Sequence, residues 1–251
     1  MKNKLAMTIG SVALLSMVSS AVFGYALLSP ARRWFPPTPF TVRVDNGGLT
    51  TVNDSSHGAN AAAAAVGAWN DPNVNVVTGQ TANVVYNPGD GQVDLLFADP
   101  LNLCTGSCIA ATLTGYYTTG STGSCGGLSV VEINDADIAF NLSYNYTTVA
   151  ETTAEGGCSN EIYLEAVVTH EVGHVIGLAH SGVSSALMAP TVSYCVNKPL
   201  ASDDFNGRNA LYNCTFVPGG GGCKSAGQVC SANSDCCSNN CKGKPGAKTC
   251  K

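Results

Sequence analysis

Five residues with a fixed spacing could carry chemistry between positions 170 and 180, where the sequence is HEVGHVIGLAH. His170 and His174 are four residues apart, so on a helix both imidazoles lie on one face and can bind one metal ion. Glu171 lies beside the first histidine, where a general base for a metal-activated water must stand. Gly177 can end the helix and turn the chain, which brings His180 back as a third ligand. Three histidines with an open fourth position are typical of catalytic zinc.

The alternative is a buried amphipathic helix whose histidines pack in the core or face solvent. The chain holds four histidines, and three of them have the spacing that a metal requires, with the glutamate and the glycine also in place. We therefore favour a metal site. Zinc lowers the pKa of its bound water to about 7, and Glu171 is expected to take that proton and pass it to the leaving amine.

The pattern HExxHxxGxxH resembles the zinc signature of the metzincin metalloproteases. Ser181 after the third histidine, and the later sequence ALMAP at 186–190, resemble the matrixins, the family of the matrix metalloproteases. Leu200, Asp203-Asp204, Gly207 and Leu211-Tyr212 are similar to the closing helix of that family, and the resemblance extends more weakly back to Arg33-Trp34.

The resemblance implies a zinc metalloendopeptidase (EC 3.4.24) with protein or peptide substrates and one catalytic zinc. It places Met188 beneath the metal as a structural support and residues 190–194 along the pocket for the substrate residue after the cut bond. Calcium is a further candidate cation, although the chain has no EF-hand-like loop that would name its ligands.

The N-terminus has the pattern of an export signal. Lys2 and Lys4 precede an apolar run from residue 5 to residue 28, with small residues near its end. We predict a signal peptide at 1–26 and a secreted, extracellular protein without stable membrane insertion after cleavage. A single membrane anchor is the alternative, because the run is about as long as a short spanning helix.

Twelve cysteines divide the exported chain into two parts, with six spread over 104–214 and six crowded into 223–250. A Pro/Gly-rich linker at 217–222 separates a catalytic domain at 27–216 from a cysteine-rich domain at 223–251. Residues 27–222 carry sixteen acidic and five basic side chains, which argues against a nucleic-acid partner. We expect a monomer.

The catalytic domain is predicted to be α+β, a twisted mixed β-sheet with three main helices. Strands are expected at 40–45, 83–86, 93–97 and 129–133, and a helix at 59–69 with its cap at 53–55. Residues 136–141 resemble the matrixin edge strand that borders the substrate cleft. The zinc helix is expected to begin near Ser159-Asn160.

The family's structural zinc site cannot form in the usual way, because His57 is the one histidine outside the motif. Cys104, Cys108, Cys125 and Cys158 are expected to staple that region with disulfides instead. Cys195 is expected to pair with Cys214, although spacing alone does not fix connectivity.

The tail has the spacing C-x6-C-x5-CC-x3-C-x8-C, which resembles knottins. That resemblance implies the pairs Cys223–Cys237, Cys230–Cys241 and Cys236–Cys250. A basic, tethered module could hold the enzyme on an anionic surface or matrix ligand, cover the active site as an inhibitor, or act as a stabilising cap. Two rival functions stay open: an inactive metzincin scaffold that displays the knottin, and a zinc hydrolase acting on bonds other than peptide bonds.

Overall fold

The structure is a computed structural model that describes residues 5–9, 24–36, 39–81, 84, 87–118, 121–219, 227–231, 233, 240–244 and 247–251, with the backbone alone for 5–9, 80 and 81. The strands are β1 Leu5–Ile9, β2 Ala26–Leu27, β3 Arg32–Arg33, β4 Phe40–Asp45, β5 Val76–Thr81, β6 Val93–Leu96, β7 Ala110–Tyr117, β8 Thr122–Cys125, β9 Leu128–Phe140, β10 Tyr146–Thr147, β11 Ile162–Tyr163, β12 Leu178–Ala179, β13 Phe216–Pro218, β14 Cys241–Lys242 and β15 Thr249–Cys250. The helices are α1 Ala59–Val66, the 3-10 turn η1 Gly67–Trp69, α2 Val149–Glu155, α3 Leu164–Val175 and α4 Ser202–Tyr212.

A mixed sheet forms the centre of the main body, with the strand order β1-β7-β9-β6-β4-β5. Strands β5, β4, β6 and β9 run parallel, whereas β7 is antiparallel to β9 and β1 is antiparallel to β7. The expected α+β class with a mixed sheet agrees with this arrangement.

The prediction of an edge strand at 136–141 is wrong. Residues 136–139 pair with β6 on one side and with β7 on the other, so this part of β9 is central. Strand β7 lies outside it, and β1 pairs only with residues 113–117 of β7. Residues 110–112 of β7 therefore form a free edge on this side of the described sheet, and β5 forms the opposite edge. The separate strand predicted at 129–133 is the first half of the same long β9.

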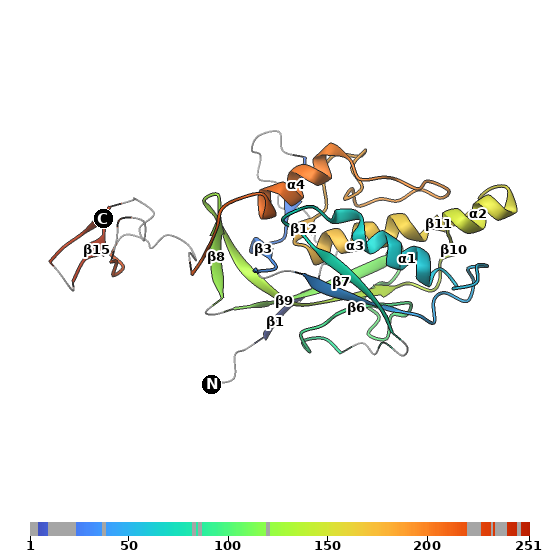
Figure 1. Ribbon diagram of the computed structural model, residues 1–251, viewed down its shortest axis with the longest axis horizontal. Helices are drawn as coiled ribbons and strands as arrows, with labels where there is room; N and C mark the ends of the chain where they lie inside the picture. The colour runs from blue at the N-terminus through green and yellow to red at the C-terminus, as the bar shows by residue number, and fades with distance from the viewer. Residues whose placement is uncertain are drawn as a thin grey trace.

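The helices α1 and α3 cover one face of this sheet (Figure 1). The strand predicted at 40–45 is confirmed as β4, and its alternation explains the layering: Val42 and Val44 are fully buried in the core, while Arg43 points to the other face. Helix α1 buries alanines at 59, 62 and 65, whose small side chains let it pack closely on its neighbours. The core between sheet and helices thus holds α3 in a fixed place.

The helix predicted from residue 59 is confirmed as α1 and η1, but the cap of α1 and the start of α3 differ from the prediction. Helix α1 follows Gly58, which adopts a left-handed conformation with φ 81°, while Asp54 accepts hydrogen bonds from the loop and Gly58 N–H groups. Helix α3 begins at Leu164 and not near 159–160, because the preceding residues pair with β10 as the short parallel strand β11. The fourth helix, α2, was not among the three predicted and is capped by Thr148, whose Oγ1 accepts from Glu151 N.

Disulfides tie the loops of the main body together, and their pairing is Cys104–Cys108, Cys125–Cys214 and Cys158–Cys195. The expected Cys195–Cys214 bond is therefore wrong. The chain after α4 returns as β13 along β8, which brings Cys214 to Cys125. Strand β13 also includes Val217 and Pro218, which the sequence analysis assigned to the linker. Most of the strand predicted at 83–86 lies outside the described residues.

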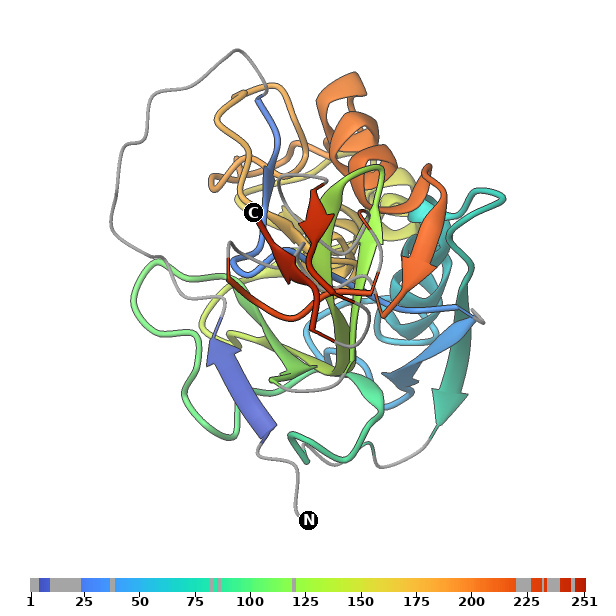
Figure 2. The ribbon, with the colours of Figure 1, turned by 90° about the vertical axis from the view of Figure 1, so that its left-hand side faces the viewer.

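The tail contributes a small antiparallel pair, β14 with β15, which lies beyond β8 in Figure 1 and in front of the main body in Figure 2. Cys230 is bonded to Cys241, and Cys250 also forms a disulfide. Cys223, Cys236 and Cys237 lie outside the described residues, so the other two pairs stay predictions. Within the described ranges, the structure contains no helix of the length and apolarity that a membrane span requires.

Candidate metal centre

Helix α3 positions the first two histidines, and a glycine ends it. Ten of its twelve residues are buried, so packing fixes its rotation. At its C-terminus the Trp34 indole Nε1–H donates to the Val175 carbonyl at 3.0 Å. Gly177 then takes φ 106°, and a Cβ placed there would lie 2.1 Å from the Arg32 carbonyl oxygen. Only glycine fits this turn, which sends the chain back as β12 toward His180.

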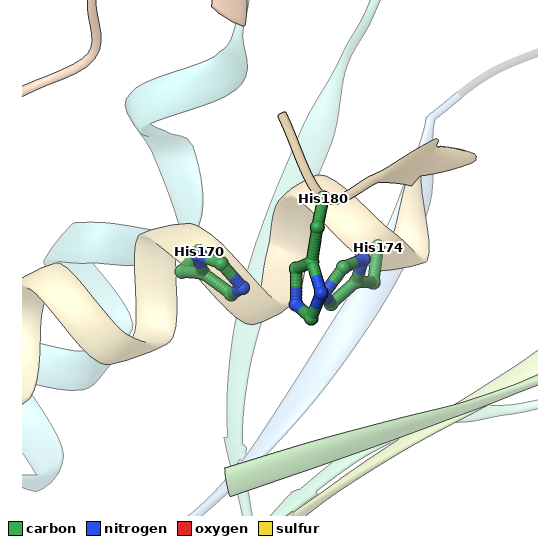
Figure 3. A group of neighbouring side chains, drawn as sticks. All are labelled: His170, His174 and His180. Carbon is green, nitrogen blue, oxygen red and sulfur yellow. The ribbon is translucent and has the colours of Figure 1, made fainter. Parts of the chain in front are cut away.

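The three histidines meet on one side of α3 (Figure 3). One ring nitrogen from each of His170, His174 and His180 lies within 4.8 Å of the others. The ring centroids are 4.9 to 5.2 Å apart. In the part of the chain that the structure describes, no further His, Cys, Asp or Glu joins this group. The donor set is therefore three imidazoles, which suits zinc with one position left for water or substrate.

Hydrogen bonds hold two of the rings in the tautomer that metal binding requires. The Nδ1 atoms of His170 and His174 each lie 2.8 Å from a backbone carbonyl, of Leu187 and Leu178 respectively. A carbonyl can only accept, so Nδ1 carries the proton and Nε2 is left as the ligand atom.

Burial favours the neutral form of these rings in the metal-free protein. It lowers the pKa of His170 and of His180 to about 4, and the neighbouring imidazoles act in the same direction. The pKa of His174 is lowered for the same two reasons. Neutral imidazoles are the ligands that a metal needs, so the residues present fit a zinc ion.

Glu171 lies in the same cleft, held by a residue that sequence reasoning missed. Its Oε2 accepts a hydrogen bond of 2.6 Å from the Thr112 hydroxyl on β7. Burial raises the pKa of the Glu171 carboxyl, while His174 and the Thr112 bond oppose that shift. No local signal marks Thr112, because it is 59 residues away along the chain. Thr112 thus orients the carboxylate beside the metal position.

Met188 packs directly against α3. A Cβ placed on Gly173 would lie 2.3 Å from the Met188 sulfur and 2.9 Å from Trp69, so this helix position must be glycine for the methionine to fit. The buried carboxylate of Asp204 accepts hydrogen bonds from the Leu187 and Met188 N–H groups at 2.8 and 2.9 Å. The resemblance to the matrixin closing helix implied no role for Asp204, whereas these hydrogen bonds hold the methionine turn in place.

A cleft of about 590 Å³ opens over Glu171 and the histidines His170 and His180. One wall is residues 107–110, the loop and the start of β7, and the other is the segment from residue 187 to residue 198. Disulfides hold both walls, Cys104–Cys108 on the first and Cys158–Cys195 on the second. Part of the expected pocket segment 190–194, namely Pro190 to Ser193, does line the cleft.

Comparison with known proteins gives a consistent family relationship over part of the chain. Residues 117–213 match the family Matrixin. The chain is 41% identical over 73 residues to Metalloendoproteinase 5-MMP of Arabidopsis thaliana, which is 29% of this chain and 20% of that protein. It is 45% identical over 58 residues to Matrix metalloproteinase-9 of Canis lupus familiaris, 23% of this chain and 8% of the relative. It is 44% identical over 79 residues to Metalloendoproteinase 2-MMP of Arabidopsis thaliana, 31% of this chain and 19% of the relative.

The chain thus spans a fifth or less of the length of these relatives. The matched region includes α3, the third histidine and the methionine turn, and β7 and the N-terminal strands lie almost entirely before it. These matches support a matrixin-like metalloprotease, and the histidine group is consistent with its metal centre.

Proposed function

We propose that this chain is a secreted zinc endopeptidase in which His170, His174 and His180 hold the metal and Glu171 is the general base. The observation that carries the proposal is the convergence of three imidazole nitrogens within 4.8 Å of one another beside the oriented Glu171 carboxylate, at a cleft that His170, Glu171 and His180 line. When bound, zinc supplies a Lewis acid that polarises a carbonyl and acidifies a water.

The protein's own groups then account for the remaining chemistry. The Glu171 carboxylate, held by Thr112, accepts a proton at Oε1 or Oε2 and later returns it to the leaving amine. Met188 and Asp204 have no chemical part and serve to hold the floor of the site.

An extended peptide is expected to bind along the free edge of β7. No strand of the described sheet pairs with residues 110–112 on the side away from β9, and Ala110 lines the cleft. A substrate strand antiparallel to β7 would add to the sheet by main-chain hydrogen bonds. In the full chain β1 already occupies the neighbouring residues 113–117. Because β1 lies inside the predicted signal peptide 1–26, its removal would lengthen the edge open to substrate.

The remaining predictions belong to this proposal as well. Secretion is supported by the disulfides of the main body. The tail is proposed to be a knottin-like module that binds an anionic surface or matrix ligand, supported by exposed lysines at 242 and 244. Calcium stays a prediction: in the described ranges, the histidine group is the one set that meets metal-binding geometry.

The test is cleavage of quenched peptides by the oxidised protein, with Glu171→Gln as the matched variant. We expect wild type to cut, chelation to stop cleavage and added zinc to restore it. Glu171→Gln should hold one zinc per chain by metal analysis and lose activity by about 10²- to 10⁴-fold.

If the full chain holds one zinc but cuts no peptide, a variant ending at residue 219 separates two explanations. Full zinc occupancy without peptide cleavage in both the full chain and this variant would contradict the proposal. Activity that returns in this variant makes the tail an inhibitor, and continued inactivity favours the scaffold function. Ester cleavage without peptide cleavage would indicate a different zinc hydrolase.

A further inference from the structure

Lys198 is the single lysine between residues 5 and 223, and it lies in the cleft. The region 27–222 carries sixteen acidic side chains against five basic ones, so a cation here is unusual for the domain. Lys198 follows the methionine turn and lines the same cavity as His170 and Glu171. Its position in the cleft therefore indicates a role in binding.

The position of the Lys198 ammonium is fixed by the turn beneath the metal site. Its Nζ donates to the Ser184 carbonyl at 3.0 Å and to the Ala186 carbonyl at 3.1 Å. The next residue, Leu187, supplies the carbonyl that orients His170. An ammonium has three N–H donors, and these two contacts leave one for a ligand in the cleft.

The other four basic side chains of residues 27–222 are already engaged. Arg43 pairs with Asp94 at 2.6 Å and Arg208 with Asp71 at 2.9 Å. Arg32 and Arg33 are buried and lie over the rings of tyrosines. Lys198 is half-buried, and within the described residues no carboxylate lies within 4.0 Å of it. Its charge is therefore available to a molecule that enters the cleft.

The walls around Lys198 are mainly apolar and are held in place. Val167 of α3 and Val192 and Val196 of the segment after the methionine turn all line this cavity. The Cys158–Cys195 disulfide and a 2.8 Å hydrogen bond from Cys195 N to the Glu161 carbonyl fix that segment to the residues before α3. A cavity lined by apolar side chains and by a held ammonium suits a side chain with an apolar stem and an anionic end.

We propose that Lys198 selects the substrate by binding a glutamate side chain at the residue after the cut bond. The inference rests on the proposed peptidase function and names its substrate class. A charge-assisted hydrogen bond in a partly dry cleft should favour glutamate over leucine at that residue by about tenfold to a hundredfold in kcat/KM. The acidic surface of the domain repels acidic peptides whichever residue carries the charge, and salt at about 0.15 M screens this repulsion beyond roughly 8 Å.

The experiment maps cut sites in a peptide library for the zinc-loaded full chain and for variants at Lys198. Wild type and Lys198→Arg should enrich glutamate after the cut bond. Lys198→Gln keeps a donor for Ser184 and Ala186 without the charge, and it should lose the preference. Lys198→Glu should reverse it toward lysine and arginine. Ala154→Glu, which adds a carboxylate at an exposed position of α2 outside the residues that line the cleft, is the control and should leave the profile unchanged.

A binding measurement keeps the inference apart from the peptidase proposal. Zinc-loaded Glu171→Gln is titrated by calorimetry with two matched peptides that differ only by glutamate or leucine at the selected residue. One outcome is that wild type cuts no peptide, while the glutamate peptide still binds more tightly than the leucine peptide and Lys198→Gln in the same background removes this difference. In that case the peptidase proposal fails and the role of Lys198 stands. Equal binding of the two peptides, or a cut-site profile that Lys198→Glu does not change, overturns the inference.

Discussion

Two buried polar clusters lie on opposite faces of the same sheet, and they are built differently. On the helix-covered face, His170, His174 and Glu171 each have a hydrogen-bond partner that fixes their orientation. On the other face, Asp94 and Asp137 are register partners on β6 and β9 and are both fully buried. Asp94 is paired with Arg43, but neither carboxylate oxygen of Asp137 has a hydrogen-bond partner.

The difference shows how a protein can tolerate buried ionisable groups. In the histidine cluster, the backbone carbonyls that bind Nδ1 of His170 and His174 leave the Nε2 atoms free to bind one metal ion. At Asp137, burial and then the nearby Asp135 and Asp94 raise the pKa to about 8, and the Asp94 N–H opposes this without making a hydrogen bond of normal geometry. Asp137 is thus expected to stay protonated where other carboxyls are charged. One cluster is organised for a ligand, whereas in the other Asp94 is paired with Arg43 and Asp137 is kept neutral by a proton.

The largest expected effect is that of zinc, which should stabilise the protein through the histidine cluster and not through the Asp137 cluster. Zinc binds the folded chain alone, so a concentration of 1,000 times Kd should stabilise the wild type by about 4 kcal/mol. His174→Ala should lose most of this gain, whereas Asp137→Asn should keep all of it. Calorimetric Tm values with zinc and with a chelator measure both. A zinc-dependent Tm rise that survives in His174→Ala would show that the metal binds elsewhere.

The second prediction concerns pH. Asp137 in the unfolded chain loses its proton near pH 4, but the folded chain keeps it to about pH 8. The unfolded state therefore binds fewer protons between these values, so this group's contribution to stability is greatest below pH 4 and is lost as the pH rises to about 8.

Asp137→Asn removes that titration. It should raise the free energy of unfolding at pH 8 by about 1 to 4 kcal/mol and change it little at pH 4. Denaturant titrations at the two pH values give the difference, and Asp45→Asn at the half-buried end of β4 is a control. Equal effects of Asp137→Asn at both pH values would mean that the carboxyl is not held neutral.

The meeting of the three histidines could be predicted from the sequence because they lie close together along the chain. A helix of 3.6 residues per turn and one glycine turn decide where His170, His174 and His180 can lie relative to each other. Contacts between elements that are distant along the chain could not be predicted in this way. Thr112 on β7 binds Glu171 on α3, and Cys214 lies next to Cys125 because β13 pairs with β8. The edge strand was misassigned for the same reason, since strand order depends on long-range pairing and not on the pattern within residues 136–141.

The third prediction tests the packing that supports the histidine cluster. Gly173→Ala would put a methyl group against the sulfur of Met188 and the ring of Trp69. Overpacking of this kind should lower the free energy of unfolding by about 1 to 3 kcal/mol and loosen zinc binding. Gly67→Ala is the matched control, because its Cβ would meet only Asn70 at 3.6 Å. Similar stability for the two variants would show that Met188 can move aside at little cost.

The smallest expected effect comes from a substitution that changes only the orientation of the Glu171 carboxylate. Thr112→Val keeps the buried shape of the side chain but removes the hydroxyl that donates to Oε2. Without that hydrogen bond the carboxylate can rotate away from the reacting bond, so kcat should fall by about tenfold while zinc content and KM stay close to wild type. Thr112→Ser, which restores the donor, should recover most of the loss.

Thr114→Val is the control on the same face of β7, since that threonine is buried and has no recorded contact with Glu171. A fall in kcat of equal size for Thr112→Val and Thr114→Val would indicate a general disturbance of β7. A fall confined to Thr112, and reversed by serine, would show that the helix-covered cluster depends on oriented partners in a way that the Asp137 cluster does not.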